Sequence, residues 1–187
     1  MDRKIIYIDI DETLNELIEV LMKLYGEKYN DPRRKKDIEK YYFLDTLKPE
    51  CKNFFKEFCT EEVLETLEMV PHAKEVVEEL IDNHDVFFLT AAHPNTLRIR
   101  DKWLKKHIDN YSSSQFIRCN NKTLLKGHLL IDDCIYNHYG SIENSILVNQ
   151  PWNKDVVLKD NMVKLNDWYE IEEYLMKEGY LKKRRVT

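Results

Sequence analysis

Short apolar runs that end in polar side chains recur along this chain. Four of them lie at residues 4–14, 86–90, 116–119 and 129–133, and a fifth apolar run lies at residues 145–148. Runs of this length that are rich in β-branched and aromatic residues are typical of buried strands. The hydropathy pattern therefore predicts five strands.

Segments with helical periodicity separate these runs. Strands that alternate with helices indicate βαβ units, which build a parallel sheet flanked by helices. Asp167 and Glu170 suit a capping box at the start of the last helix. We therefore predict an α/β protein with a parallel five-stranded sheet, and we expect helices near residues 14–25, 72–83, 95–109 and 167–177.

The region between residues 25 and 69 breaks this alternation. It contains a polar, charged stretch at residues 30–36, and short helical patterns follow, one of them N-capped by Thr60. We expect residues 25–69 to form a small helical cap inserted after the first polar strand end. The core domain then comprises residues 1–24 and 70–187.

Pairs of carboxylates end the first and the fourth runs, namely Asp9 with Asp11 and Asp132 with Asp133. Two anions held close together repel each other unless a cation lies between them or one binds a proton. In phosphoryl transfer Mg²⁺ provides that cation. Because open α/β sheets bind ligands at the carboxyl ends of their strands, both pairs should meet at one edge and hold Mg²⁺ there.

Thr90 ends the second run and Lys122 follows the third. A hydroxyl and an ammonium at the same edge can bind phosphate oxygens. Lys126 is an alternative to Lys122, because it also precedes the second acid pair closely. Asp9 lies at a strand end and is the better nucleophile for an aspartyl-phosphate. Asp11 can protonate the departing alkoxide and later activate water.

In this order the motifs resemble those of the haloacid dehalogenase superfamily of phosphohydrolases. They read Asp9-x-Asp11-x-Thr13, Thr90, Lys122 and Asp132-Asp133. The chain looks most like the 5′(3′)-deoxyribonucleotidases, because Asn121-Lys122-Thr123 precedes the second acid pair and a helical insert follows the first motif. The resemblance implies a Rossmann-like core and the hydrolysis of nucleoside monophosphates.

The resemblance also implies a set of metal ligands. Mg²⁺ would be held by the carboxylates of Asp9 and Asp132 and by the backbone carbonyl of Asp11. Such hard oxygen ligands suit Mg²⁺ well and zinc poorly. Asp133 is expected to orient the metal's water shell or to hold Lys122.

Three positions depart from the pattern of this family. Glu12 stands where the family often has Gly, and Ala91-Ala92 follows Thr90 where Ser-Pro is common. Cys134 follows the second acid pair where a basic residue is frequent. These differences bear on substrate identity and rate, because none removes a catalytic group.

Substrate choice should reside in the cap, which can close over the site and exclude water. Tyr41, Tyr42 and Phe43 could stack on a nucleobase. Most of Phe54, Phe55 and Phe58 are expected to form the cap's own small core instead.

Two other functions fit the same motifs. One is a phosphatase of this fold that acts on a sugar phosphate or a phosphoamino acid. The other is a non-catalytic binding protein, which the intact acids and lysine disfavour. Basic residues at positions 33–36 also leave open a phosphatase of nucleic-acid ends.

Composition fits a cytoplasmic enzyme with small-molecule substrates. Charged residues make up 34% of the 187 residues and the formal net charge is −5, so no nucleic-acid partner is expected. No apolar stretch has the length of a membrane span, and we expect no signal peptide. We predict that the four cysteines are reduced and that the basic stretch at residues 182–185 is solvated. A homodimer is compatible with this interpretation.

Overall fold

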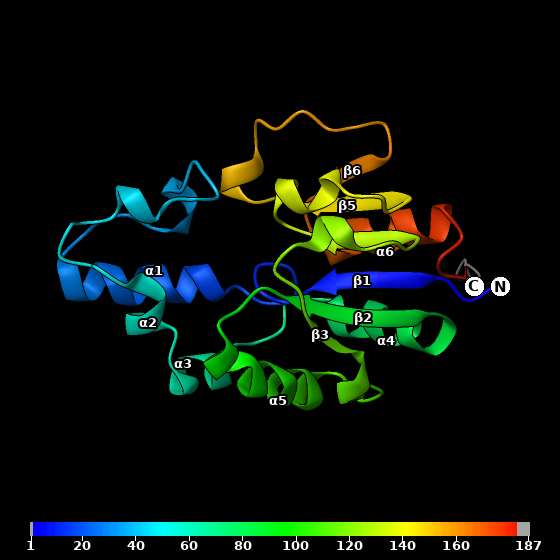
Figure 1. Ribbon diagram of the computed structural model, residues 1–187, viewed down its shortest axis with the longest axis horizontal. Coiled ribbons are helices and arrows are strands. Elements are labelled where there is room, and N and C mark those ends of the chain that lie inside the picture. The colour runs from blue at the N-terminus through cyan, green and yellow to red at the C-terminus, as the bar shows by residue number, and fades with distance from the viewer. Residues whose placement is uncertain (1, 183–187) are drawn as a thin grey trace.

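A single parallel sheet with the strand order β3-β2-β1-β4-β5-β6 forms the centre of the computed structural model, which describes residues 2–182 (Figure 1). Residues 183–185 of the basic stretch lie outside this range. The predicted α/β class with a parallel sheet is confirmed. The strands are β1 (Ile5–Asp9), β2 (Asp85–Thr90), β3 (Phe116–Arg118), β4 (Leu129–Asp132), β5 (Asn144–Val148) and β6 (Met162–Leu165).

The expected strand number of five is wrong, because β6 adds a sixth. This edge strand has the sequence Met-Val-Lys-Leu, and only Met162 in it is buried. It pairs with β5 alone, in a register that sets Ser145 opposite Met162. A four-residue edge strand that contains a lysine lacks the continuous apolar run of a central parallel strand.

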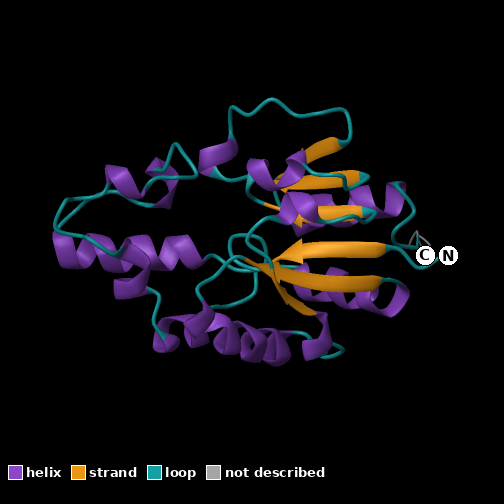
Figure 2. Cartoon of the chain, viewed as in Figure 1, coloured by secondary structure: helices purple, strands orange, loops and turns teal. Residues whose placement is uncertain are grey.

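The α-helices are α1 (Leu17–Tyr29), α2 (Phe54–Phe58), α3 (Glu61–Thr66), α4 (Ala73–Asn83), α5 (Leu97–His107) and α6 (Trp168–Lys177). Helices α4, α5 and α6 flank the sheet, whereas α1, α2 and α3 lie beyond the carboxyl ends of its strands (Figure 2). Four α-helices separate β1 from β2 and one separates β2 from β3, whereas only 3-10 helices separate the later strands.

The expected N-caps are present, since Asp167 accepts hydrogen bonds from Tyr169 N and Glu170 N, and Thr60 accepts one from Val63 N. Glu170 accepts from Asn166 N instead of Asp167 N, so the reciprocal bond of the predicted capping box is not formed.

The two faces of the sheet bury different partners. Ile6 and Ile8 of β1 point into the main core, which also contains side chains of α4, α5 and α6. Tyr7 points to the opposite face and packs with Leu89 and Leu130 in a smaller cluster. Because side chains alternate along a strand, every second residue of the apolar run serves each face, and the run can be apolar throughout.

The elements of the cap lie beyond the carboxyl ends of the strands, where the arrowheads point in Figure 1. Helix α1 is continuous across the boundary predicted near residue 25, and the division into a cap of residues 25–69 and a core of residues 1–24 and 70–187 stays a prediction. At the far end of the cap, Trp103 Nε1 of α5 donates to the carbonyl oxygen of Leu67 at 2.7 Å. The cap therefore covers the sheet edge at which open α/β folds bind ligands.

Aromatic rings hold the cap together. The ring of Phe54 lies 5.6 Å from those of Phe43 and Phe58 and 6.0 Å from that of Tyr25, all in edge-on contacts. Edge-on contacts at these distances are the favoured packing of aromatic pairs. Phe54 and Phe58 are buried, but they belong to the same apolar cluster as Ile6 and Ile8 of β1, so the expected separate core of the cap is wrong. Phe55 is exposed.

Candidate active site

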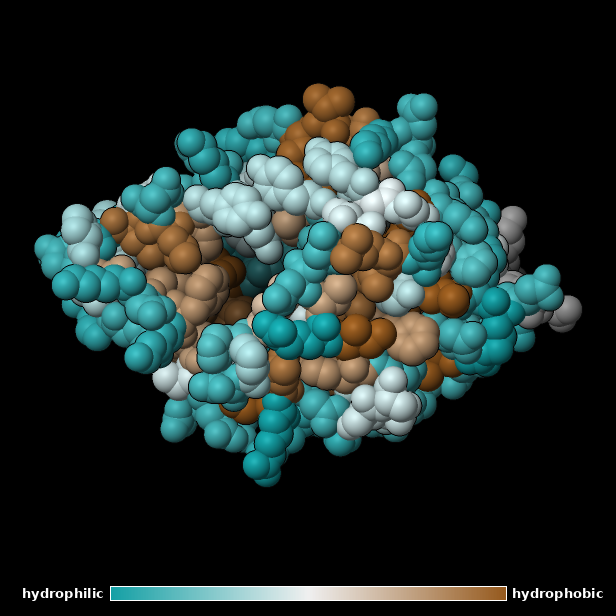
Figure 3. Space-filling view, viewed as in Figure 1, coloured by the Kyte–Doolittle hydropathy of each residue, from teal (hydrophilic) through white to brown (hydrophobic). Residues whose placement is uncertain are grey.

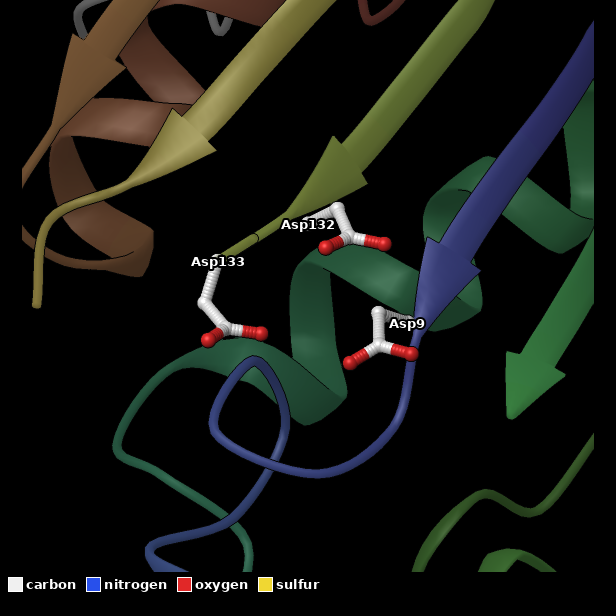
Figure 4. Close-up of side chains that lie close together, drawn as sticks. All are labelled: Asp9, Asp132 and Asp133. Carbon is white, nitrogen blue, oxygen red and sulfur yellow. The ribbon is translucent and has the colours of Figure 1, made fainter. Parts of the chain in front are cut away.

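Three buried carboxylates converge at the carboxyl ends of β1 and β4 (Figure 4). One oxygen each of Asp9, Asp132 and Asp133 lies within 4.8 Å of the others. The sheet register explains the approach, because Ile8 pairs with Ile131 and the next residue on each strand is an aspartate. Parallel pairing of two acid-ending strands therefore builds the cluster from residues far apart in sequence.

Lys122 inserts its ammonium into this cluster. Its Nζ forms ion pairs with Asp9 Oδ1 and, at 2.6 Å, with Asp132 Oδ2. Burial alone would lower the pKa of Lys122, but the carboxylates of Asp132 and Asp9 outweigh it and raise that pKa above its ordinary value of 10.5. Lys126, the alternative, is exposed. The geometry thus favours Lys122 as the cation of the site.

One lysine does not compensate all three acids. Burial, together with the carboxylates of Asp132 and Asp11, raises the pKa of Asp9 to about 7 even though Lys122 acts in the opposite direction. Burial and the charges of Asp132 and Asp9 also raise the pKa of Asp133 well above its ordinary value of 3.8. A second cation would relieve this repulsion, and three carboxylates are the hard oxygen ligands that Mg²⁺ prefers. The residues present therefore fit a divalent metal.

Hydrogen bonds fix the two acids of β4. Asp132 Oδ1 accepts from Cys134 N at 2.8 Å, and Asn137 Nδ2 donates to both oxygens at 3.0 Å. Asp133 Oδ2 accepts from Trp152 Nε1 at 2.9 Å. Such outer contacts orient metal ligands. The sequence analysis missed Asn137 and Trp152, although both belong to polar segments that directly follow predicted strands.

Asp11 lies apart from this cluster and contacts Arg100 of α5. Arg100 donates to Asp11 Oδ2 through Nε at 2.8 Å and through a terminal nitrogen at 2.7 Å. Arg100 is buried, whereas the side chain of Asp11 is 23% exposed. The sequence analysis did not single out Arg100, because a helical arginine remote from every motif carries no signal of its own.

Glu12 adopts a backbone conformation that favours glycine, with φ at 63°. Its carboxylate compensates, because Oε1 accepts from Ile18 N at 2.5 Å and Oε2 lies 2.6 Å from Lys35 Nζ. Burial raises the pKa of Glu12 to about 7, although Lys35 acts in the opposite direction. The charge that departs from the family pattern is thus paired with a lysine of the cap, although it still contributes to the raised pKa of Asp133.

Thr90 ends β2 beside β1, in the register that pairs Asp9 with Leu89. Its side chain is buried and its Oγ1 accepts a hydrogen bond from Ala92 N at 3.1 Å. This contact orients the hydroxyl at the edge of the cavity that also contains Asp9 and Lys122. Thr90 is therefore within the same site as the residues that the motifs predicted.

A cavity of about 980 Å³ opens above these groups, between the cap and the sheet edge. Figure 3 shows the hollow on this face, with apolar residues on its walls. Tyr41 and Tyr42 line it from the cap, and Tyr136 lines it from the loop after β4. The rings of Tyr42 and Tyr136 stack at 5.7 Å with an interplanar angle of 26°. Phe43 lines the cavity too, but is buried against Phe54.

Tyr136 is a residue that the sequence analysis missed. It follows Asp133 by three residues and is half exposed, and its ring also lies 6.3 Å from that of Tyr41. Its position close to the second acid pair in the sequence could have indicated that it belongs to the site. The cavity thus has aromatic surface on both its cap side and its core side.

Solved structures of low sequence identity share this fold. A haloacid dehalogenase-like family hydrolase from Streptococcus pneumoniae superimposes with a TM-score of 0.61 at 13% identity, covering 92% of this chain and 98% of that chain. A HAD family hydrolase from Deinococcus radiodurans R1, with bound phosphate and sodium, gives a TM-score of 0.58 at 12% identity, covering 97% and 99%. This chain therefore has the fold of these haloacid dehalogenase-like hydrolases.

Relatives found by sequence similarity assign the chain to a narrower family than the fold does. A 5′(3′)-deoxyribonucleotidase of Clostridium acetobutylicum is 30% identical over 171 residues, covering 91% of this chain and 93% of the relative. A 5′(3′)-deoxyribonucleotidase of Bacillus subtilis is 26% identical over 182 residues, covering 93% and 99%. The family described as 5′ nucleotidase, deoxy (Pyrimidine), cytosolic type C protein matches residues 3–180. The chain belongs to this nucleotidase family, and the resemblance inferred from its motifs is confirmed.

Membership in this family makes the protein an enzyme of the phosphatase class. Within residues 2–182, no helix combines the length and apolar character needed to cross a bilayer.

Proposed function

We propose that the protein is a Mg²⁺-dependent phosphomonoesterase of the cytoplasm that hydrolyses nucleoside monophosphates, with deoxyribonucleotides preferred. The observation that carries this proposal is one cavity lined both by Asp9 and Lys122 of the Asp9–Lys122–Asp132 ion-pair cluster and by Tyr41, Tyr42 and Tyr136. The lysine beside the acids suits a phosphate group, and the tyrosine rings suit a nucleoside. The names of the relatives supply the preference for deoxyribonucleotides.

Asp9, Asp132 and the backbone carbonyl of Asp11 are the proposed protein ligands of Mg²⁺, and Asp133 is proposed to orient the metal's water shell. The proximity of Asp133 to Asp9 and Asp132 is compatible with this role. When bound, Mg²⁺ neutralises charge on the carboxylates and on the phosphate.

The reaction then proceeds in two displacements. A carboxylate oxygen of Asp9 attacks phosphorus, and the bond from phosphorus to the nucleoside oxygen breaks while Asp11 gives that oxygen a proton. Water next attacks the aspartyl-phosphate and loses its proton to Asp11, which releases inorganic phosphate and restores Asp9. The side chain of Asp11, which is partly exposed and lines the cavity, is accessible for both transfers.

Thr90 and Lys122 are the proposed phosphate ligands. The Thr90 hydroxyl can donate to a phosphate oxygen, since Ala92 N already donates to it. Lys122 is buried beside the nucleophile and can offset charge on the transferring group.

The nucleobase is proposed to bind against the tyrosines of the cavity. Tyr41 and Tyr42 present ring surface from the cap, and Tyr136 does so from the core. Phe43 is proposed to support this wall from behind, because it is buried against Phe54.

A phosphate-release screen tests the proposal. The purified protein is assayed with deoxyribonucleoside and ribonucleoside monophosphates, sugar phosphates, a phosphoamino acid and p-nitrophenyl phosphate, with Mg²⁺ and after chelation. We expect deoxyribonucleotides to give the highest kcat/KM, and chelation to abolish turnover. Faster turnover of a sugar phosphate would assign the protein to another substrate class, and inactivity towards every phosphomonoester would contradict the proposed reaction.

A further inference from the structure

Arg100 is a buried charged residue of the site that none of the catalytic roles above includes. It lies on the first turns of α5, and its guanidinium reaches the loop after β1, 89 residues away in sequence. Its only anionic hydrogen-bond partner among the described residues is Asp11.

Arg100 contacts only one of the two carboxylate oxygens of Asp11. Both contacts from Arg100 end on Oδ2, at 2.8 and 2.7 Å. Oδ1 has a long hydrogen bond of 3.4 Å from Asn15 Nδ2. Two charged donors on one oxygen fix the position of that oxygen more firmly than a single donor does. Arg100 therefore holds Oδ2 of Asp11, and Oδ1 has no contact with the guanidinium.

Arg100 is itself held in place from two directions. Thr96 Oγ1, one turn earlier on the same side of the helix, accepts from a terminal nitrogen of the guanidinium at 2.7 Å. A second terminal nitrogen contacts Cys59 Sγ of the cap at 4.0 Å. A guanidinium held by further contacts can position its partner, since catalytic geometry depends on supporting residues that do not move.

We infer that Arg100 is a positioning residue that holds Asp11 in place for its proton transfers to the leaving group and from water. This inference rests on the proposed phosphomonoesterase reaction. A purely structural ion pair would need no access to substrate, whereas Asp11 and Arg100 both line the cavity.

The leaving group provides a selective test. A nucleoside alkoxide is a strong base and needs a proton as its bond to phosphorus breaks, whereas p-nitrophenolate leaves without one. The value of kcat/KM reports the steps up to and including that bond cleavage. Mispositioning of a catalytic group by about 1 Å can cost roughly a hundredfold in rate. The loss of Arg100 should therefore affect a nucleotide far more than an aryl phosphate.

The experiment compares Arg100→Met with Arg98→Met, which removes an exposed arginine from the same helix. We expect Arg100→Met to lower kcat/KM for a deoxyribonucleoside monophosphate about ten- to a hundredfold, and kcat/KM for p-nitrophenyl phosphate less than threefold. Arg98→Met should match the parent on both substrates. Arg100→Lys should recover part of the loss, and it replaces Arg100→Met in the comparison if that variant does not fold.

A double variant separates positioning from structural support. In an Asp11→Asn background, Arg100→Met should have no further effect on nucleotide turnover, because the group that it positions is absent. Equal losses on both substrates, or additive losses in the double variant, would overturn the inference. If the parent protein hydrolyses no phosphomonoester at all, the proposed function fails instead, so the two failures are distinguishable.

Discussion

Lys35 Nζ of the cap lies 2.6 Å from Glu12 Oε2, and both side chains are almost fully buried. Glu12 lies in the turn that follows Asp9 and Asp11. The turn needs a left-handed residue at position 12, which costs a side chain about 1–2 kcal/mol relative to glycine. The ion pair offsets this cost and joins the cap to the first motif. The ion pair with Lys35 therefore explains how glutamate is tolerated at position 12, where glycine would need no such partner.

This relationship predicts coupled stability effects. Lys35→Met leaves a buried carboxylate without its partner and should lower the free energy of unfolding by roughly 3–5 kcal/mol. Glu12→Gly/Lys35→Met removes the charge and relaxes the backbone, so it should recover most of that loss. Urea unfolding followed by circular dichroism measures both. Losses that simply add in the double variant would show that the pair does not stabilise the turn.

Asp9→Asn should abolish turnover while the fold survives. The amide keeps the size of the side chain but cannot form an aspartyl-phosphate. Because burial raises the pKa of Asp9 to about 7, a neutral side chain at this position should be tolerated. We expect kcat to fall by several orders of magnitude, with an unchanged circular dichroism spectrum. Asp160→Asn, at an exposed position, is the control, and near-parental turnover by folded Asp9→Asn would exclude Asp9 as the nucleophile.

Asp132→Asn and Lys122→Met should damage different steps. Asp132→Asn removes a charged oxygen from the proposed metal site, so the Mg²⁺ concentration needed for half-maximal activity should rise more than the KM for substrate. Lys122→Met removes the ammonium beside the nucleophile, so affinity for inorganic phosphate as an inhibitor should fall instead. Titrations of each variant with Mg²⁺ and with phosphate separate the two effects. If both variants titrate like the parent, the roles given to these residues are wrong.

Tyr42→Leu and Tyr136→Leu should each impair nucleotide hydrolysis selectively. Stacking of a base on an aromatic ring is worth about 1–3 kcal/mol, which corresponds to roughly a ten- to a hundredfold change in kcat/KM. p-Nitrophenyl phosphate has no nucleobase, so we expect each variant to turn it over at nearly the parental rate. Equal losses on both substrates would mean that the stacked pair only connects the cap to the core.

The strand ends were predictable from the sequence, because each combines an apolar run with a polar residue whose chemistry suits phosphate or metal. Asp9, Lys122 and Asp132 meet in the structure for the reason given by the pattern, since parallel strands end at one edge. Their catalytic and metal-binding roles stay predictions. The β6 strand was missed because an edge strand buries too little to have a distinct pattern.

Contacts between helices and loops could not be predicted from the sequence. Arg100 and Asp11 pair across 89 residues, and the stacking of Tyr42 on Tyr136 joins the cap to a loop of the core. Neither pair follows from local periodicity, because each depends on how α5 and the cap dock onto the sheet edge. Tertiary packing of this kind leaves no mark on a single sequence.

The central position of β1 in the sheet has a consequence for the order in which the protein folds during synthesis. Its two neighbours are β2, which begins 80 residues later with Asp85 opposite Ile5, and β4, which sets Leu129 opposite Ile6. A ribosome must therefore extrude most of the protein before β1 can complete its pairing, and such long-range contacts form slowly. The repulsion between Asp9 and the acids of β4 arises only when β4 docks beside β1. Insertion of β4 is thus the folding step at which a divalent cation should have its largest effect.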